Sequence, residues 1–332
     1  MAMENTNTLR GTRVLITGGA GLVGSHLTDQ LIRAGTREVI IYDDMSRGRL
    51  ENLRETLSQN QVTLVRHDIR NRSELARAMV GVDILFHLAS IRMPQCAEEP
   101  RLAMEVMVDG TFNVMEAAVA ARIKKVVAAS SASIYGMADR LPISEEQHPY
   151  HNSTLYGAAK IFTEALLASF REMHGLDYVI LRPFNIYGPR METHGPHTEV
   201  LVRWLDRISR GLPPILFGDG NQSMDFIYVE DAARAFVLAA TSNVSGEAFN
   251  VATGVETTLK QLAQSLLAAM ESPLGITFGP QRNLATVARS FGDTSKAAKY
   301  LGFRAEVPLA EGLRRMVTWW QEQNQTAGSR AE

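Results

Sequence analysis

Residues 13–27 read RVLITGGAGLVGSHL, and this stretch decides the fold. An apolar run leads into three glycines, Gly18, Gly21 and Gly24, which open an amphipathic segment that ends at Gly35. Glycines at this spacing permit a tight turn, let a pyrophosphate approach the backbone, and pack a helix closely on a strand. The free N–H groups at the start of the helix favour phosphate. The stretch therefore predicts a strand, a dinucleotide-binding turn and a helix.

The chain around this stretch alternates between strand-like and helix-like segments. Near-continuous apolar runs are separated by helical patterns over the first 185 residues. This alternation is typical of an α/β fold, here a Rossmann-type doubly wound parallel sheet with helices on both faces. Past residue 185 the sequence is rich in Gly, Pro, His and Asn, and residues 185–200 are expected to form a loop. We expect a smaller C-terminal substrate-binding region. The predicted division is 10–185 and 226–258 for the NAD-binding domain, and 186–225 and 259–325 for the substrate-binding region.

Composition excludes several classes of partner. The formal net charge is −2 over 332 residues, without a block of like charge, which argues against nucleic acid and anionic membranes. Cys96 is the only cysteine, so neither an internal disulfide nor a thiolate metal cage can form. No apolar run approaches the ~18 residues of a membrane span, and the N-terminal residues are polar. We expect a cytoplasmic protein without a metal.

Acidic residues follow the second and third predicted strands. Asp43 and Asp44 can accept hydrogen bonds from adenosine ribose hydroxyls and repel a 2′-phosphate, which favours NAD over NADP despite the nearby Arg47. Asp68 can reach the adenine edge or cap a helix, and both interpretations stay open. Asn71 is predicted to be the N-cap of the helix over residues 71–81.

A tyrosine and a lysine stand four residues apart at the start of a predicted helix. This spacing puts Tyr156 and Lys160 on one face. An ammonium beside a phenol, together with the positive nicotinamide, would lower the phenol pKa from ~10 toward neutrality. Tyr156 could then exchange a proton with a sugar or alcohol hydroxyl while hydride moves to or from the cofactor. Lys160 is expected to hold the nicotinamide ribose as well.

Four motifs in order resemble the extended short-chain dehydrogenase/reductase family, in its nucleotide-sugar epimerase and dehydratase branch: TGGAGLVGSHL, YGAAK, LRPFNIYGPR and FGDGNQSMDFIYVEDAARA. The resemblance covers residues 11–322 and is closest to UDP-glucose and UDP-glucuronate 4-epimerases. It implies NAD as cofactor, a UDP-sugar as substrate, and a homodimer that pairs the helices over residues 102–119 and 160–174.

The resemblance implies a catalytic triad of Ser131, Tyr156 and Lys160, with Ser130 supporting the strand end. Dehydratases and decarboxylases of this branch carry a Glu two positions after the triad Ser or Thr, whereas this chain has Ala132 and Ser133. The reaction implied is therefore 4-epimerisation through a transient 4-keto sugar. A nucleotide-sugar reductase or dehydrogenase is the alternative, and a dehydratase or a non-catalytic NAD-binding sensor is less favoured.

The same matching assigns two sets of site residues. The cofactor set is Gly18, Gly21, Leu22, Val23, Asp43, Asp44, Ser46, Asp68, Ile69, Leu88, Ala89, Ser90, Tyr156, Lys160 and Pro183. The substrate set is Arg92, Ser131, Ser133, Asn185, Arg190, Thr198, Glu199, Val200, Phe217, Met224, Arg282 and Arg289.

The sequence departs from the family pattern at the substrate diphosphate. Met224 stands where the family motif R-D-F-I-Y-V has an arginine, and we expect Arg289 or Arg282 to supply the missing cation. Arg190 is predicted either to pair with a sugar carboxylate, as in UDP-glucuronate, or to brace its own loop. His194 and His197 are expected to stabilise that loop. Met107 replaces a family asparagine.

Overall fold

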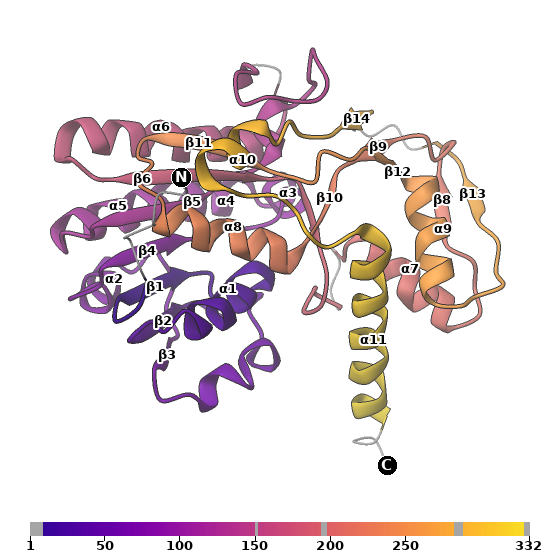
Figure 1. Ribbon diagram of the computed structural model, residues 1–332, viewed down its shortest axis with the longest axis horizontal. Helices are drawn as coiled ribbons and strands as arrows, with labels where there is room; N and C mark the ends of the chain where they lie inside the picture. The colour runs from indigo at the N-terminus through magenta and orange to yellow at the C-terminus, as the bar shows by residue number, and fades with distance from the viewer. Residues whose placement is uncertain (1–8, 150–151, 194–197, 282–287, 329–332) are drawn as a thin grey trace, which may run out of the picture.

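A computed structural model describes residues 9–149, 152–193, 198–281 and 288–328. Its centre is a seven-stranded sheet in the order β11-β6-β5-β4-β1-β2-β3, and every neighbouring pair is parallel (Figure 1). The strands are β1 (Arg13–Thr17), β2 (Glu38–Tyr42), β3 (Val62–Val65), β4 (Ile84–His87), β5 (Lys125–Ala129), β6 (Tyr178–Pro183) and β11 (Glu247–Val251). The predicted Rossmann-type fold is confirmed.

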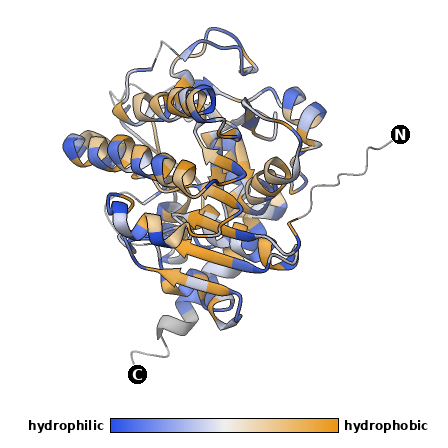
Figure 2. Cartoon of the chain, turned by 90° about the vertical axis from the view of Figure 1, so that its left-hand side faces the viewer, coloured by the Kyte–Doolittle hydropathy of each residue, from blue (hydrophilic) through white to orange (hydrophobic). Residues whose placement is uncertain are grey.

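Helices cover both faces of this sheet. On one face α1 (Leu22–Arg33), α8 (Val229–Thr241) and α10 (Ser295–Leu301) share one hydrophobic core with the strands. On the other face α2 (Arg72–Ala78), α5 (Thr111–Ala120) and α6 (Leu155–His174) share a second core. Within β1, Val14 and Ile16 belong to the first core and Leu15 to the second. Strands buried on both faces are mainly apolar, and they form the hydrophobic centre of Figure 2.

Three short helical segments connect β4 to α5. They are α3 (Met93–Glu98), α4 (Pro100–Met104) and a π-helical turn (Glu105–Gly110) that continues into α5. Single 3₁₀ turns cover Leu50–Leu53, Thr56–Ser58 and Ala132–Tyr135. Asn71 caps α2 as predicted, because its side chain accepts a hydrogen bond from the backbone N–H of Glu74. Among the described residues, no helix combines the length and apolar character needed to cross a membrane.

A smaller region packs beside the carboxyl ends of the strands and has its own core (Figure 1). Trp204, Leu262 and Met316 bring three of its helices together. Those helices are α7 (Val200–Ser209), α9 (Leu259–Ala269) and α11 (Leu309–Gly328). Its strands are β8 (Ile215–Phe217), β9 (Ser223–Met224), β12 (Thr257–Thr258), β13 (Thr277–Gly279) and β14 (Arg289–Ser290).

Two details differ from the sequence expectations. Residues 185–200 were expected to be a loop, but Asn185–Tyr187 form β7, which pairs in parallel with β10 (Phe226–Tyr228). Pairing with a distant strand is invisible in the local composition, which is why the loop expectation was wrong here. In addition, α10 lies in the sequence range assigned to the substrate-binding region, yet its residues Ala297 and Leu301 pack in the core of the sheet.

A buried ion pair ties α6 to the sheet. The Arg182 guanidinium on β6 donates through Nε and Nη2 to the two carboxylate oxygens of Glu164 on α6, at 2.9 and 2.6 Å. Both side chains are largely buried, at 12% and 15% exposed. Arg182 also donates to the Tyr135 hydroxyl at 2.9 Å, and that hydroxyl donates to Asn250 on β11 at 2.7 Å. This network positions α6, the helix that carries Tyr156 and Lys160.

Replacing Arg182 with alanine should destabilise the protein by about 3–5 kcal/mol, because it leaves the buried Glu164 carboxylate without its counter-charge. The free energy of unfolding from urea titration would show this. The matched control is Arg72→Ala, which breaks the Arg72–Glu116 pair, 71% and 39% exposed, and should change stability by less than about 1 kcal/mol. Equal losses in the two variants would contradict the role given to the buried pair.

Candidate active site

The sheet order places a binding cleft at the carboxyl ends of β1 and β4. These strands are neighbours, but the chain leaves them toward opposite edges of the sheet, and ligands of doubly wound sheets bind at such a switch point. A cleft of about 940 Å³ opens there. Its walls include the glycine turn, the ends of β2, β4 and β5, and Tyr156 and Lys160 on α6. The far side is formed by residues 183–186, 190–192, 198–199 and Arg203.

The glycine turn brings α1 directly against the end of β1. Gly18 has φ +71°, and a Cβ there would lie 2.9 Å from the backbone nitrogen of Ala89. A Cβ at Gly24 would overlap the carbonyl oxygen of Gly18 and lie 2.6 Å from Gly19 Cα. Only glycines satisfy both positions, so the N-terminus of α1 faces the cleft across a backbone without side chains. This is the cradle that a pyrophosphate requires.

The acidic residues after β2 have different surroundings. Asp43 is buried, and its carboxylate accepts hydrogen bonds from the N–H groups of Ala20 and Met45, both at 2.9 Å. It thereby joins the end of β2 to the glycine turn while lining the cleft. Burial raises the pKa of Asp43. Asp44 is exposed and accepts hydrogen bonds from the N–H and hydroxyl of Ser46.

Asp68 lines the cleft at the end of β3 and is not the cap of α2, because Asn71 holds that place. Its carboxylate accepts hydrogen bonds from Arg70, at 2.7 Å from the closer guanidinium nitrogen. Of its two interpretations, contact with the adenine edge therefore stays as a prediction.

A buried hydrogen-bond chain anchors the strand end that lines the cleft. Thr17 Oγ1 accepts from the N–H groups of Leu88 and Ala89, so it donates its own proton to His87 Nδ1 at 2.8 Å. His87 Nε2 then carries the ring proton and donates to Thr111 Oγ1 at 3.1 Å. Burial lowers the pKa of His87 to about 3. The imidazole is neutral at pH 7 and joins β1, β4 and α5.

The structure brings Tyr156 and Lys160 together on the cleft wall. Lys160 Nζ donates to the Ala129 carbonyl at 2.8 Å and lies 5.8 Å from the centroid of the Tyr156 ring. Thr154 caps α6 by accepting from the Gly157 N–H, which sets where the helix begins. Burial lowers the pKa of Lys160 to about 8, so the ammonium still predominates at pH 7.

The Tyr156 phenol does not show the lowered pKa expected from the sequence. Burial raises its pKa, and hydrogen bonds with Ser131 and Ser90 act in the opposite direction. The reason is its surroundings, since Tyr156 packs against the apolar cluster of Ile91, Cys96 and Ala159 while Lys160 is directed at a carbonyl. The protein alone therefore holds a neutral phenol. The charge of a bound nicotinamide, which the expectation included, acts in the lowering direction.

Three serines at the end of β5 differ in their hydrogen bonding. Ser131 Oγ donates to Ser133 Oγ and accepts from the Ser133 N–H, both at 3.1 Å. Ser130 Oγ is buried and has no hydrogen-bond partner among the described residues, although Ser130 lines the cleft. A buried hydroxyl with an unused donor in a cleft wall is suited to a polar ligand.

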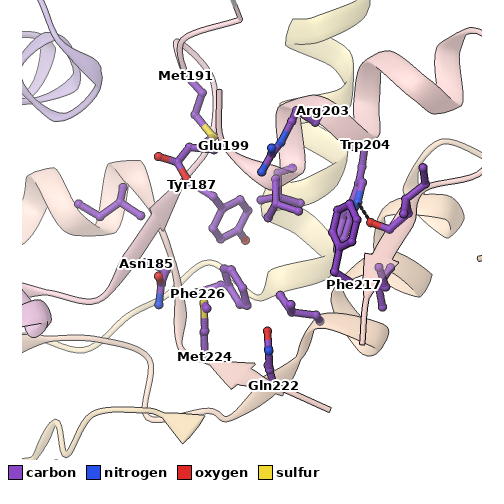
Figure 3. A pocket seen from close by; sticks show the side chains of 16 residues that line it. Asn185, Tyr187, Met191, Glu199, Arg203, Trp204, Phe217, Gln222, Met224 and Phe226 are labelled. Carbon is purple, nitrogen blue, oxygen red and sulfur yellow. Dashed lines mark hydrogen bonds between the residues drawn. The ribbon is translucent and has the colours of Figure 1, made fainter. Parts of the chain in front are cut away.

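A second cavity of about 390 Å³ adjoins the cleft (Figure 3). It lies between α7, β8, β9 and β10, with Trp204, Phe217 and Phe226 among its walls. Of the predicted substrate residues, Asn185, Glu199, Val200, Phe217 and Met224 line it. Arg92, Ser131, Ser133, Arg190 and Thr198 line the larger cleft, as do all predicted cofactor residues.

Most arginines predicted near the substrate have carboxylate partners. Arg92 lies 2.9 Å from Glu192, which is also 3.5 Å from Arg47. Arg190, at φ +68°, lies 2.8 Å from Asp29 on α1, as its loop-bracing interpretation requires.

Arg289 does not supply the cation expected beside Met224. It pairs through two nitrogens with Glu256, at 2.6 and 2.7 Å, and lines neither cavity. The strand of Arg289, β14, and the strand that follows Glu256, β12, both pair with β9, an arrangement that the sequence pattern could not reveal. Arg282, His194 and His197 lie outside the described residues. Within the part of the chain that the structure describes, no cluster of three potential metal ligands occurs.

Sequence reasoning missed Arg203 on α7, which lines both cavities. It also missed Glu192 and Asp29, the acidic partners of Arg92 and Arg190. No motif marks Arg203. The available signal was its place in a helix whose other face is apolar, next to a loop of polar and small residues.

Comparison with known proteins places this site in a family. A family model described as the NAD dependent epimerase/dehydratase family matches residues 14–252. The chain belongs to this family. It is 34% identical to a UDP-glucose 4-epimerase of Mycolicibacterium smegmatis, over 94% of this chain and all of the relative. It is 29% identical to a dTDP-glucose 4,6-dehydratase of an Actinoplanes species, over 93% of this chain and 98% of the relative.

A solved structure agrees over the whole length. It is a UDP-N-acetylglucosamine 4-epimerase from Methanobrevibacter ruminantium, in complex with UDP-N-acetylmuramic acid, with a TM-score of 0.89 and 32% identity. It covers 95% of this chain and 99% of that one. NAD is the cofactor of the family, and the glycine cradle, the Asp43 carboxylate and the unpartnered Ser130 hydroxyl all fit a dinucleotide.

Replacing His87 with glutamine should make the protein less sensitive to acid. An unfolded histidine binds a proton below pH about 6.5, whereas His87 in the fold does so only near pH 3, so stability falls as pH falls through this window. Between pH 7 and pH 5 the variant should lose about 2 kcal/mol less than the wild type. Urea unfolding at both pH values measures this. Identical losses would show that His87 protonation does not contribute.

Proposed function

We propose that the protein is an NAD-dependent nucleotide-sugar 4-epimerase that acts on a UDP-hexose. The observation that carries the proposal is the convergence of Ser131, Tyr156 and Lys160 on one wall of the cleft that contains the glycine cradle. The two residues after Ser131 are Ala132 and Ser133, so the end of β5 offers no carboxylate for elimination. Family relatives include both epimerases and dehydratases, and this absence favours the epimerase.

The chemistry divides between the cofactor and the chain. Bound NAD supplies a hydride acceptor and donor for sugar C4. Tyr156 takes the proton of the C4 hydroxyl as the C4–H bond breaks, and C4 becomes a ketone. After the ketone presents its other face, Tyr156 returns the proton to the oxygen as hydride returns to carbon. Oxidation and reduction cancel, so the net reaction inverts C4.

The neighbours of Tyr156 support this role. Because burial raises the pKa of the phenol, its ionisation requires nearby positive charge, which a bound nicotinamide would supply. The Lys160 ammonium lies 5.8 Å from the centroid of the ring. The Ser131 hydroxyl hydrogen-bonds Ser133 and Tyr156, and in this proposal it also hydrogen-bonds the reacting oxygen. The smaller cavity, with Phe217 and Phe226 in its walls, has the size and apolar character that suit a nucleoside.

Ion pairing in the cleft favours a neutral sugar over a hexuronate. Arg190 and Arg92 are the cleft arginines predicted beside the sugar, where a guanidinium fork could recognise a carboxylate at C6. The Arg190 guanidinium lies 2.8 Å from the Asp29 carboxylate. The Arg92 guanidinium lies 2.9 Å from the Glu192 carboxylate, so each arginine already has an acidic partner. A sugar carboxylate would have to displace one of them. We therefore propose UDP-glucose and UDP-galactose as the substrate pair.

We also propose a homodimer formed through α5 and α6. Phe112 on α5 packs edge-on against Phe170 on α6 yet stays 40% exposed, and Met173 on α6 is 61% exposed. These exposed apolar side chains on adjoining helices suit a second copy of the same pair of helices.

The purified protein should interconvert UDP-glucose and UDP-galactose without net formation of NADH. Tyr156→Phe should lower kcat by about 10²–10⁴-fold, because the acid/base group is lost. Separation of the two C4 epimers measures turnover, and absorbance at the NADH wavelength measures redox balance. The control is Tyr300→Phe, a change at a 52% exposed tyrosine that should leave turnover unchanged.

Two outcomes would reject the epimerase. Accumulation of NADH in proportion to substrate would indicate a dehydrogenase. Full activity of Tyr156→Phe would remove the proposed acid/base residue.

Arg190→Ala should reduce turnover of each accepted UDP-sugar by a similar factor, because Arg190 braces the cleft wall against Asp29. Initial rates with UDP-glucose, UDP-N-acetylglucosamine and UDP-glucuronate test this. A loss confined to UDP-glucuronate would instead identify Arg190 as a carboxylate receptor and contradict the bracing role.

A further inference from the structure

The two cavities share part of their lining, here called the passage, and one cation belongs to it. Five residues line both cavities: Asn185, Ile186, Met191, Glu199 and Arg203. Arg203 is the only positively charged member of this set. It projects from α7 into the cavity, on the opposite side from Met224 in Figure 3.

The guanidinium of Arg203 differs in its partners from those of Arg47, Arg92 and Arg190, which also line the cleft. Arg92 and Arg190 are each within 2.9 Å of a carboxylate, and Arg47 is 3.5 Å from one. The Arg203 side chain makes no ion pair or hydrogen bond with the described residues, and it is exposed. Its backbone N–H donates to the Glu199 carbonyl at 3.1 Å within α7, so the guanidinium is the part of Arg203 that remains available to a ligand among the described residues.

A nucleotide sugar that spans both cavities would place its diphosphate in this passage. With the sugar at Tyr156 and the nucleoside beside Phe217, the connecting group passes Asn185 and Arg203. The diphosphate carries two negative charges that lose water on entering. Met224 lies at the same cavity and its thioether provides no charge.

We infer that Arg203 binds the substrate diphosphate and supplies from α7 the cation that Met224 does not supply from β9. The inference rests on the proposed nucleotide-sugar substrate. The planar guanidinium can donate two parallel hydrogen bonds to phosphate oxygens, and such charge-assisted bonds are about twice as strong as neutral ones. Arg203 thus acts on binding of the nucleotide part and not on proton transfer at Tyr156.

The test compares UDP with uridine by isothermal titration of the NAD-loaded protein. Arg203→Ala should weaken UDP binding by roughly 10–100-fold, because a hydrogen bond to a charged group is lost. Uridine has no phosphate, so its affinity should stay within about twofold, which also reports that the variant is folded. Arg203→Lys keeps the charge without the fork and should lie between the wild type and Arg203→Ala.

Arg289→Ala is the matched control, since Arg289 is paired with Glu256 and lines neither cavity. Its UDP affinity should equal that of the wild type. Unchanged UDP affinity in Arg203→Ala would overturn the inference, and so would an equal loss for uridine and UDP. A selective loss of UDP affinity in a protein that epimerises no UDP-sugar would support the diphosphate site while the proposed reaction fails. Epimerase activity of the wild type, together with unchanged UDP affinity in Arg203→Ala, would support the proposed reaction while the diphosphate site fails.

Discussion

The close approach of α1 to the turn after β1 is the constraint on which the rest of the structure depends. Without side chains at Gly18 and Gly24, the first turn of α1 rests on the backbone at Gly18 and Gly19. This approach directs the helix N-terminus at the cleft and packs α1 against α8 over one face of the sheet. It also leaves Gly18 beside Ala89, so the ends of β1 and β4 form one continuous floor. The Thr17–His87–Thr111 chain then holds that floor in place.

Charged side chains inside the fold differ in how many partners they have. Where a charge is structural, it is paired and satisfied, as Arg182 is by Glu164 and Tyr135. Two cations of the cavity walls have few partners among the described residues: Lys160 Nζ donates to one carbonyl, and the Arg203 guanidinium makes no ion pair. Burial lowers the pKa of the Lys160 ammonium and raises the pKa of the Tyr156 phenol. A bound cofactor and substrate would supply further partners to both groups.

Features encoded within a few residues were predictable. The glycine turn, the apolar strands, the Asn71 cap and the Tyr156–Lys160 spacing all follow from local geometry, and the structure confirms that arrangement. Features that depend on distant partners were not. The strand at Asn185–Tyr187 exists because Phe226–Tyr228 lies beside it, and the Tyr156 pKa depends on an apolar cluster contributed by separate helices.

The sequence by itself determined the order of elements, the dinucleotide cradle and the set of reactive side chains, because short-range sterics and periodicity specify them. The tertiary structure alone decided which cations are available to a ligand. Arg190 and Arg289 were both candidates for the substrate anion, but Asp29 and Glu256 pair with them. Arg203, which no motif marks, lies at the junction of the two cavities. Ion pairing depends on which side chains meet in space, and that meeting is set by the packing of elements far apart in the chain.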